Sequence, residues 1–138
     1  MSPALPRLRW LRSVAAVLAG FATVFILSVG ADALVYGLGL VPPGHPMSDP
    51  LFALAALYRA AFTVAGGYVT ARLAPDRPMA HAWVLAGVGL LAGLGGVAAW
   101  YAARSPEFGP AWYAISIPVT AIPCVWAGAR LAIRKAGV

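Results

Sequence analysis

The chain has 138 residues, of which 62% are hydrophobic and 10% charged, and it carries a formal net charge of +6. A soluble domain of this length cannot bury so much apolar surface, so the composition predicts a membrane protein. The basic residues flank apolar runs and form no single patch, which argues against nucleic-acid binding and indicates contact with lipid head groups. The single cysteine, Cys124, excludes an intrachain disulfide and a multi-cysteine metal site.

Four apolar runs predict an all-α fold, in which residues 1–138 form a single membrane domain of four transmembrane helices that run up, down, up and down. Each run is long enough to cross a hydrocarbon core of about 30 Å. Segments rich in proline and glycine separate the runs, and Asp49 followed by Pro50 is typical of an N-cap and a first helical residue. The predicted helices cover approximately residues 13–41, 50–73, 79–103 and 110–133.

The distribution of basic residues predicts the orientation of these helices. Eight flanking basic residues lie before the first run, between the second and third, or after the fourth, whereas the two opposite loops contain only Arg104. The positive-inside rule then places both termini in the cytoplasm, as in a multi-pass protein of a bacterial inner membrane. Aromatic belts are expected at both interfaces, with Trp10, Tyr68, Trp83 and Trp126 inside and Trp100, Tyr101, Trp112 and Tyr113 outside.

The first run has an alternative interpretation as a cleaved signal peptide, with an A-x-A-like site near residues 29–33. The apolar stretch before that site is longer than the usual h-region of about 7–15 residues, and hydrophobicity continues beyond it. These features favour an uncleaved transmembrane helix.

Two charged residues, Asp32 and Arg59, lie inside the apolar runs. Asp32 precedes Leu40, near the expected outer end of the first helix, by eight residues, and Arg59 follows Pro50 at the start of the second by nine, so both fall at nearly the same depth. An uncompensated charge at this depth costs at least about 2.5–3.5 kcal/mol. The sequence therefore predicts a buried intramembrane ion pair, with Tyr36 or Tyr58 hydrogen-bonded to it. The alternative is that the Arg59 side chain extends to the outer surface.

Small and hydroxyl-bearing residues recur on one face of each run, and such faces let membrane helices approach closely. Pro118 and Pro123 are expected to kink or loosen the fourth helix. The candidate polar lining of the helix interfaces is Ser28, Tyr36, Tyr58, Thr63, Thr70, Ser116 and Thr120. The candidate helix-packing residues are Gly66, Gly67, Gly89, Gly93, Gly96 and Gly128.

Catalytic chemistry is not indicated by any motif. Serine and histidine residues do not form a nucleophile–base arrangement, and the glycine-rich segment 87–96 lies within an apolar run with no strand before it. His45, Asp49 and Glu107 fall in the outer loops without a metal-ligand spacing, so they are interpreted as solvated loop residues. We therefore expect no enzymatic activity, no cofactor and no metal.

Three segments, YRAAFTVAGGYVTARLAP, MAHAWVLAGVGL and GPAWYAISIPVTAIPCVWAGARL, together resemble a family of small bacterial four-helix membrane proteins without an assigned activity. The first helix is also similar, with Asp32 in SVGADAL. The resemblance covers most of the chain beyond Arg12 and implies a four-helix integral membrane protein. The matching positions are Tyr58, Arg59, Gly66, Gly67, Tyr68, Arg72, His81, Gly109, Pro110, Trp112, Tyr113, Trp126 and Gly128.

For function, the sequence favours a non-catalytic structural or accessory subunit that acts through helix–helix association within the lipid bilayer, with a second copy or a partner membrane protein. The alternative is a small proton-linked transporter or exporter in which Asp32 titrates. Small multidrug exporters are also four-helix chains with a carboxylate in the first span, an analogy at the level of the fold. A paired arginine favours the ionised carboxylate, which argues against proton exchange.

Overall fold

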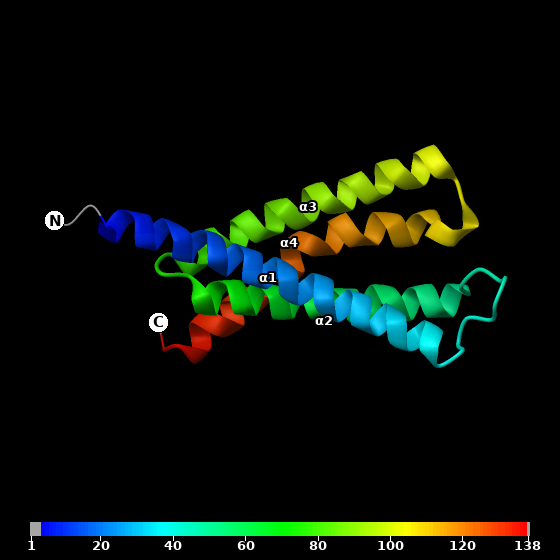
Figure 1. Cartoon of the computed structure of the whole chain (residues 1–138), viewed down its shortest axis with the longest axis horizontal. Helices are drawn as coiled ribbons and strands as arrows, with labels where there is room; N and C mark the ends of the chain where they lie inside the picture. Colours follow the sequence, from blue (N-terminus) through cyan, green and yellow to red (C-terminus); the bar gives the residue numbers. More distant parts are fainter. Residues whose placement is uncertain (1–3, 138) are drawn as a thin grey trace.

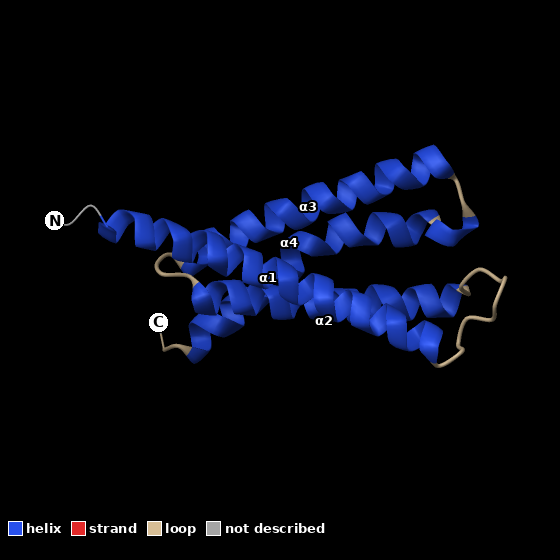
Figure 2. Cartoon of the chain, in the orientation of Figure 1, coloured by secondary structure: helices blue, strands red, loops and turns tan. Residues whose placement is uncertain are grey.

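The computed structural model describes residues 4–137, and within that range the protein is helical, with no strand. The predicted all-α fold with four helices is confirmed (Figure 2). Each of the four α-helices has the length and the apolar composition needed to cross a membrane. The elements are α1 (Ala4–Gly37), α2 (Asp49–Leu73), α3 (Pro78–Ala103), the short 3-10 helix η1 (Pro106–Phe108) and α4 (Ala111–Lys135).

Consecutive helices run in opposite directions (Figure 1). Both chain ends and the α2–α3 connection lie at one end of the molecule, the terminal end, and the other two connections lie at the opposite end, the loop end. The most extensive packing is that of α4 against α2, followed by α3 against α4 and α1 against α2. Helices α1 and α3 converge where Gly20 faces Leu85, and they diverge toward the loop end.

The boundaries of α1 differ from those expected. The helix begins nine residues earlier, because the segment before Ser13 is rich in leucine and arginine, which are good helix formers. It ends at Gly37, and not near Val41, because Gly39 adopts a positive φ of 70° and the following amides bond back to the last turn.

The expected N-cap of α2 is wrong by one residue. Ser48, with an extended backbone, is the N-cap, and Asp49 lies within the first turn. A carboxylate at that position still favours the helix, because it faces the positive end of the helix dipole.

Glycines bring the backbones of α2 and α4 into contact. A methyl group at Gly67 would lie 2.8 Å from the Cα atom of Val125, and one at Gly128 would lie 2.8 Å from the amide nitrogen of Tyr68. Close approach of this kind is how membrane helices gain packing energy where lipid provides no hydrophobic drive. The two glycines therefore set the α2–α4 distance.

The other expected packing glycines differ in how closely a neighbouring helix approaches them. A methyl group at Gly66 would meet the carbonyl oxygen of Gly20 at 2.8 Å, and one at Gly93 would meet Pro118 at 2.9 Å. Gly89 allows an ordinary contact of 3.5 Å with the Ala121 side chain. The expectation for Gly96 is wrong: a methyl group there would meet no described atom within 4 Å beyond the nearby backbone of its own helix.

Helix α4 extends from Ala111 to Lys135 and contains both Pro118 and Pro123. Pro118 is buried against Gly93, so its ring serves the α3–α4 contact.

The buried core lies in the half of the molecule nearer the terminal end. It is built mainly from small side chains of α2, α3 and α4, with Leu85 and Val125 as its larger members. The loop half is less tightly packed, and the cavities described below lie there or extend into it from the edge of the core.

Candidate functional site

The two charges of the apolar runs meet between α1 and α2. Nη2 of Arg59 lies 2.5 Å from Oδ2 of Asp32, and the hydroxyl group of Tyr58 donates a hydrogen bond to Oδ1 of the same carboxylate. Both oxygens of Asp32 therefore accept bonds from neighbouring residues of α2. This arrangement fixes the carboxylate of α1 against α2 by charge and by geometry.

The ion pair differs from the expectation in depth and in burial. Asp32 lies five residues before the end of α1 and Arg59 ten residues after the start of α2, which correspond to about 7.5 and 15 Å along the helix axes. The long arginine side chain covers this difference. The Arg59 and Asp32 side chains keep 31% and 32% of their surface exposed, so the pair is half-buried.

A cavity of about 210 Å³, called here the charged pocket, opens beside this ion pair. Asp32 and Arg59 line it together with Tyr36, Glu107 and Tyr113. Tyr36 and Glu107 also line a larger cavity of about 460 Å³ among the loops. The shared residues connect the ion pair with the loop end of the molecule, and a polar solute could reach it by this route.

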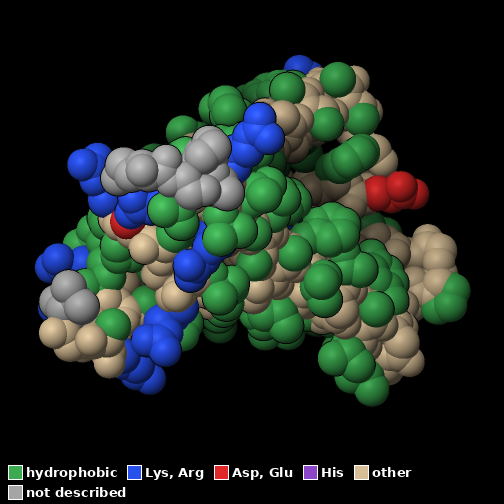
Figure 3. Space-filling model, turned by 60° about the vertical axis from the view of Figure 1, so that its left-hand side comes forward, with side chains coloured by type: hydrophobic (Ala, Val, Ile, Leu, Met, Phe, Trp, Pro, Cys, Tyr) green, Lys and Arg blue, Asp and Glu red, His purple; other side chains and the backbone are tan. Residues whose placement is uncertain are grey.

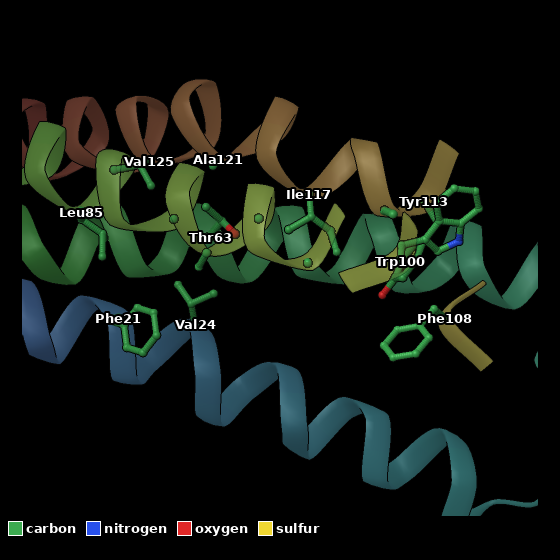
Figure 4. A pocket seen from close by; sticks show the side chains of 15 residues that line it. Phe21, Val24, Thr63, Leu85, Trp100, Phe108, Tyr113, Ile117, Ala121 and Val125 are labelled. Atoms are coloured by element: carbon green, nitrogen blue, oxygen red, sulfur yellow. The ribbon is translucent and has the colours of Figure 1, made fainter. Parts of the chain in front are cut away.

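A second cavity, called here the apolar groove, has a volume of about 300 Å³ and lies between α1 and α3 (Figure 4). Phe21 and Val24 of α1 face Thr63 and Leu85 across it, and Trp100 lies near its other end. The apolar groove and the charged pocket are adjacent, since two residues from η1 and α4 line both: Phe108 and Tyr113.

No protein family, curated protein or solved structure matches this chain. The family resemblance described above therefore stays an expectation, and the site is interpreted from its own geometry. Within residues 4–137, no three His, Cys, Asp or Glu side chains are grouped so that they could hold a metal ion. His45 and Glu107 line the same loop cavity, without Asp49.

The expected polar lining is only partly assembled around these cavities. Tyr36 lines the charged pocket, Tyr58 bonds to Asp32, and Thr63 lines the apolar groove. The other four residues line neither cavity. Ser28 and Thr70 are buried within the helix packing, and the hydroxyls of Ser116 and Thr120 donate to carbonyl oxygens of their own helix.

Sequence reasoning missed the aromatic and acidic residues at the loop end. Trp100 and Tyr113 were expected in an outer aromatic belt and Glu107 in a solvated loop, yet all three line the site. The connection between α3 and α4 folds back over the groove, and the indole Nε1 of Trp100 donates to the carbonyl oxygen of Gly109 at 2.8 Å. The sequence feature that could have predicted this arrangement is the short α3–α4 connection, which keeps η1 close to the helix ends at the loop end.

Proposed function

We propose that this is a multi-pass protein of a bacterial inner membrane with both termini in the cytoplasm. The support is the concentration of Lys and Arg side chains about the terminal end (Figure 3). Aromatic side chains accompany them, since the guanidinium of Arg130 lies 5.3 Å from the Trp126 ring and the ammonium of Lys135 lies 6.0 Å from the Tyr68 ring. Basic and aromatic side chains together are typical of a cytoplasmic membrane interface.

Topology is tested with alkaline phosphatase fusions. Because the enzyme is active only outside the cytoplasm, a fusion after Gly44 is expected to be active and a fusion after Asp76 inactive. Western blots of both fusions control for expression. Activity after Asp76 but not after Gly44 would contradict the proposed orientation.

Within this membrane setting, we propose that the protein is a non-catalytic accessory subunit that acts through helix–helix association, first of all with a second copy of itself. One observation carries the proposal. On the face of α3 opposite α4, Val84 and Leu91 are 56% and 71% exposed. A methyl group at Gly87 or Gly95 would meet no described atom within 4 Å beyond the nearby backbone of α3. A helix face of glycines beside exposed branched side chains allows the close approach that drives association in lipid.

Self-association is measured by energy transfer between labelled copies as they are diluted in liposomes. Gly95→Leu should weaken it about 10-fold, because the larger side chain holds the helices apart. The matched control is Gly30→Leu on α1, which also projects into open space and is expected to leave association unchanged. Equal effects of the two substitutions, or no energy transfer in the wild type, would contradict association through α3.

A further inference from the structure

The apolar groove and the charged pocket are adjacent, and one is lined mainly by apolar residues whereas the other contains the charged residues. The apolar part lies between α1 and α3, where the helices diverge (Figure 4). The charged part shares Tyr36 and Glu107 with the cavity among the loops. Phe108 and Tyr113 join the two parts because they line both. A ligand that fills both parts must itself be amphipathic.

The groove has a mainly apolar lining and a volume of about 300 Å³, which suits an acyl chain. The α3 face that we propose for self-association carries Gly95, which does not line the groove, whereas Gly96 does. The two surfaces are therefore separate.

The charges in the pocket indicate the sign of the head group. Asp32 and Arg59 compensate each other, and Glu107 forms no ion pair with any described residue. The charged groups that line the pocket therefore sum to one negative charge. The aromatic side chains of Tyr36, Phe108 and Tyr113 are also present, and aromatic faces attract ammonium groups.

We propose that the protein binds a single-chain amphiphile with an ammonium head, which it takes up from the bilayer between α1 and α3. The alkyl chain lies in the apolar groove, against Gly96 and Trp100. The ammonium head lies in the charged pocket, beside Glu107 and the Asp32–Arg59 pair. This inference is independent of self-association through α3.

The test uses the full chain in phosphatidylglycerol nanodiscs and an alkyltrimethylammonium probe with a brominated chain. Bromine quenches indole fluorescence at short range, so Trp100 reports on occupancy of the groove. We expect saturable quenching that is absent in Trp100→Phe and retained in Trp83→Phe. Probes with the same chain but a sulfate or maltoside head should not saturate in the same concentration range. Equal quenching by all three probes would contradict recognition of the head.

Substitutions at two neighbouring glycines test the groove and the association face independently. Gly96→Leu projects into the groove and should weaken binding of the ammonium probe about 10-fold, because the side chain takes the place of buried methylene groups. Gly95→Leu should bind the probe as the wild type does. Self-association should be weakened by Gly95→Leu and unchanged in Gly96→Leu. Unchanged quenching in Gly96→Leu would overturn the proposal, and Ala92→Leu, also on the groove wall, repeats the test if Gly96→Leu does not fold.

The contribution of the head group is tested at Glu107. Glu107→Gln keeps the shape of the side chain and removes its charge, so the preference for the ammonium probe should fall about 5-fold, as expected for an exposed charge pair. Binding of the maltoside probe should not change. A preference retained in full would exclude Glu107 as the recognition charge and would contradict the proposed position of the head.

Discussion

Asp32→Asn and Arg59→Gln are each expected to lower the free energy of unfolding by about 2–4 kcal/mol. This range lies between exposed pairs at about 0–1 kcal/mol and buried pairs at about 3–5 kcal/mol, because one-third of each side chain is exposed. Each single substitution leaves the other residue beside apolar helix faces without its partner. Loss of Arg59 leaves Tyr58 as the remaining donor to the Asp32 carboxylate.

The double variant Asp32→Asn with Arg59→Gln should be more stable than the sum of the two single losses predicts. No charge then lacks its partner, so the coupling energy should be at least about 1 kcal/mol. The exchange Asp32→Arg with Arg59→Asp should recover part of the loss, limited by the different side-chain lengths. The measurement is the free energy of unfolding in mixed micelles for the wild type, both single variants and the double variant.

The chain offers a matched control at its terminal end. Nη2 of Arg9 lies 2.9 Å from Oδ2 of Asp76, but those side chains are 67% and 47% exposed. The same double-mutant cycle on Arg9 and Asp76 should give a coupling energy of about 0–1 kcal/mol. If the Asp32–Arg59 cycle gave an equally small coupling energy, the ion pair would contribute little to the free energy of unfolding. That outcome would favour the alternative of a proton-linked transporter.

The sequence predicted the helices because their signals are local. Hydrophobic runs of membrane-spanning length, separated by proline and glycine, require no knowledge of tertiary contacts. The juxtaposition of Asp32 and Arg59 was also predictable, since a short loop joins their helices and the cost of an uncompensated charge in lipid favours pairing. The start of α1 at Ala4 was not predicted, because the charged segment before Ser13 was treated as a flank of the membrane span.

The two cavities were not predictable because they depend on how the helices diverge. Gly93 and Gly96 both line the apolar groove, yet a methyl group at Gly93 would meet Pro118 of α4, whereas one at Gly96 would meet nothing beyond the nearby backbone of its own helix. The difference comes from the angle between α1 and α3, which no short segment specifies. Glu107 likewise acquires its position from the turn after α3, where sequence alone predicts only a polar loop residue.

Gly128→Ala is expected to lower the free energy of unfolding by about 1–3 kcal/mol, the usual cost of inserting a methyl group into a close-packed contact. The methyl group would overlap the carbonyl oxygen of Val64 and lie 2.8 Å from the amide nitrogen of Tyr68. Both atoms belong to the backbone of α2, so relief requires that α2 and α4 move apart. Gly128→Leu should prevent the native contact altogether.

The control for Gly128 is Gly30→Ala, for which the sign of the effect reverses. Gly30 lies within α1 and has no neighbour within 4 Å in the part of the chain described. Alanine there should raise the stability by up to about 1 kcal/mol, because it favours the helix and meets nothing. Val64→Ala should not rescue Gly128→Ala, since the overlapping atom of Val64 is its carbonyl oxygen. Rescue by that truncation would mean that side chains, and not the two backbones, set the distance between α2 and α4.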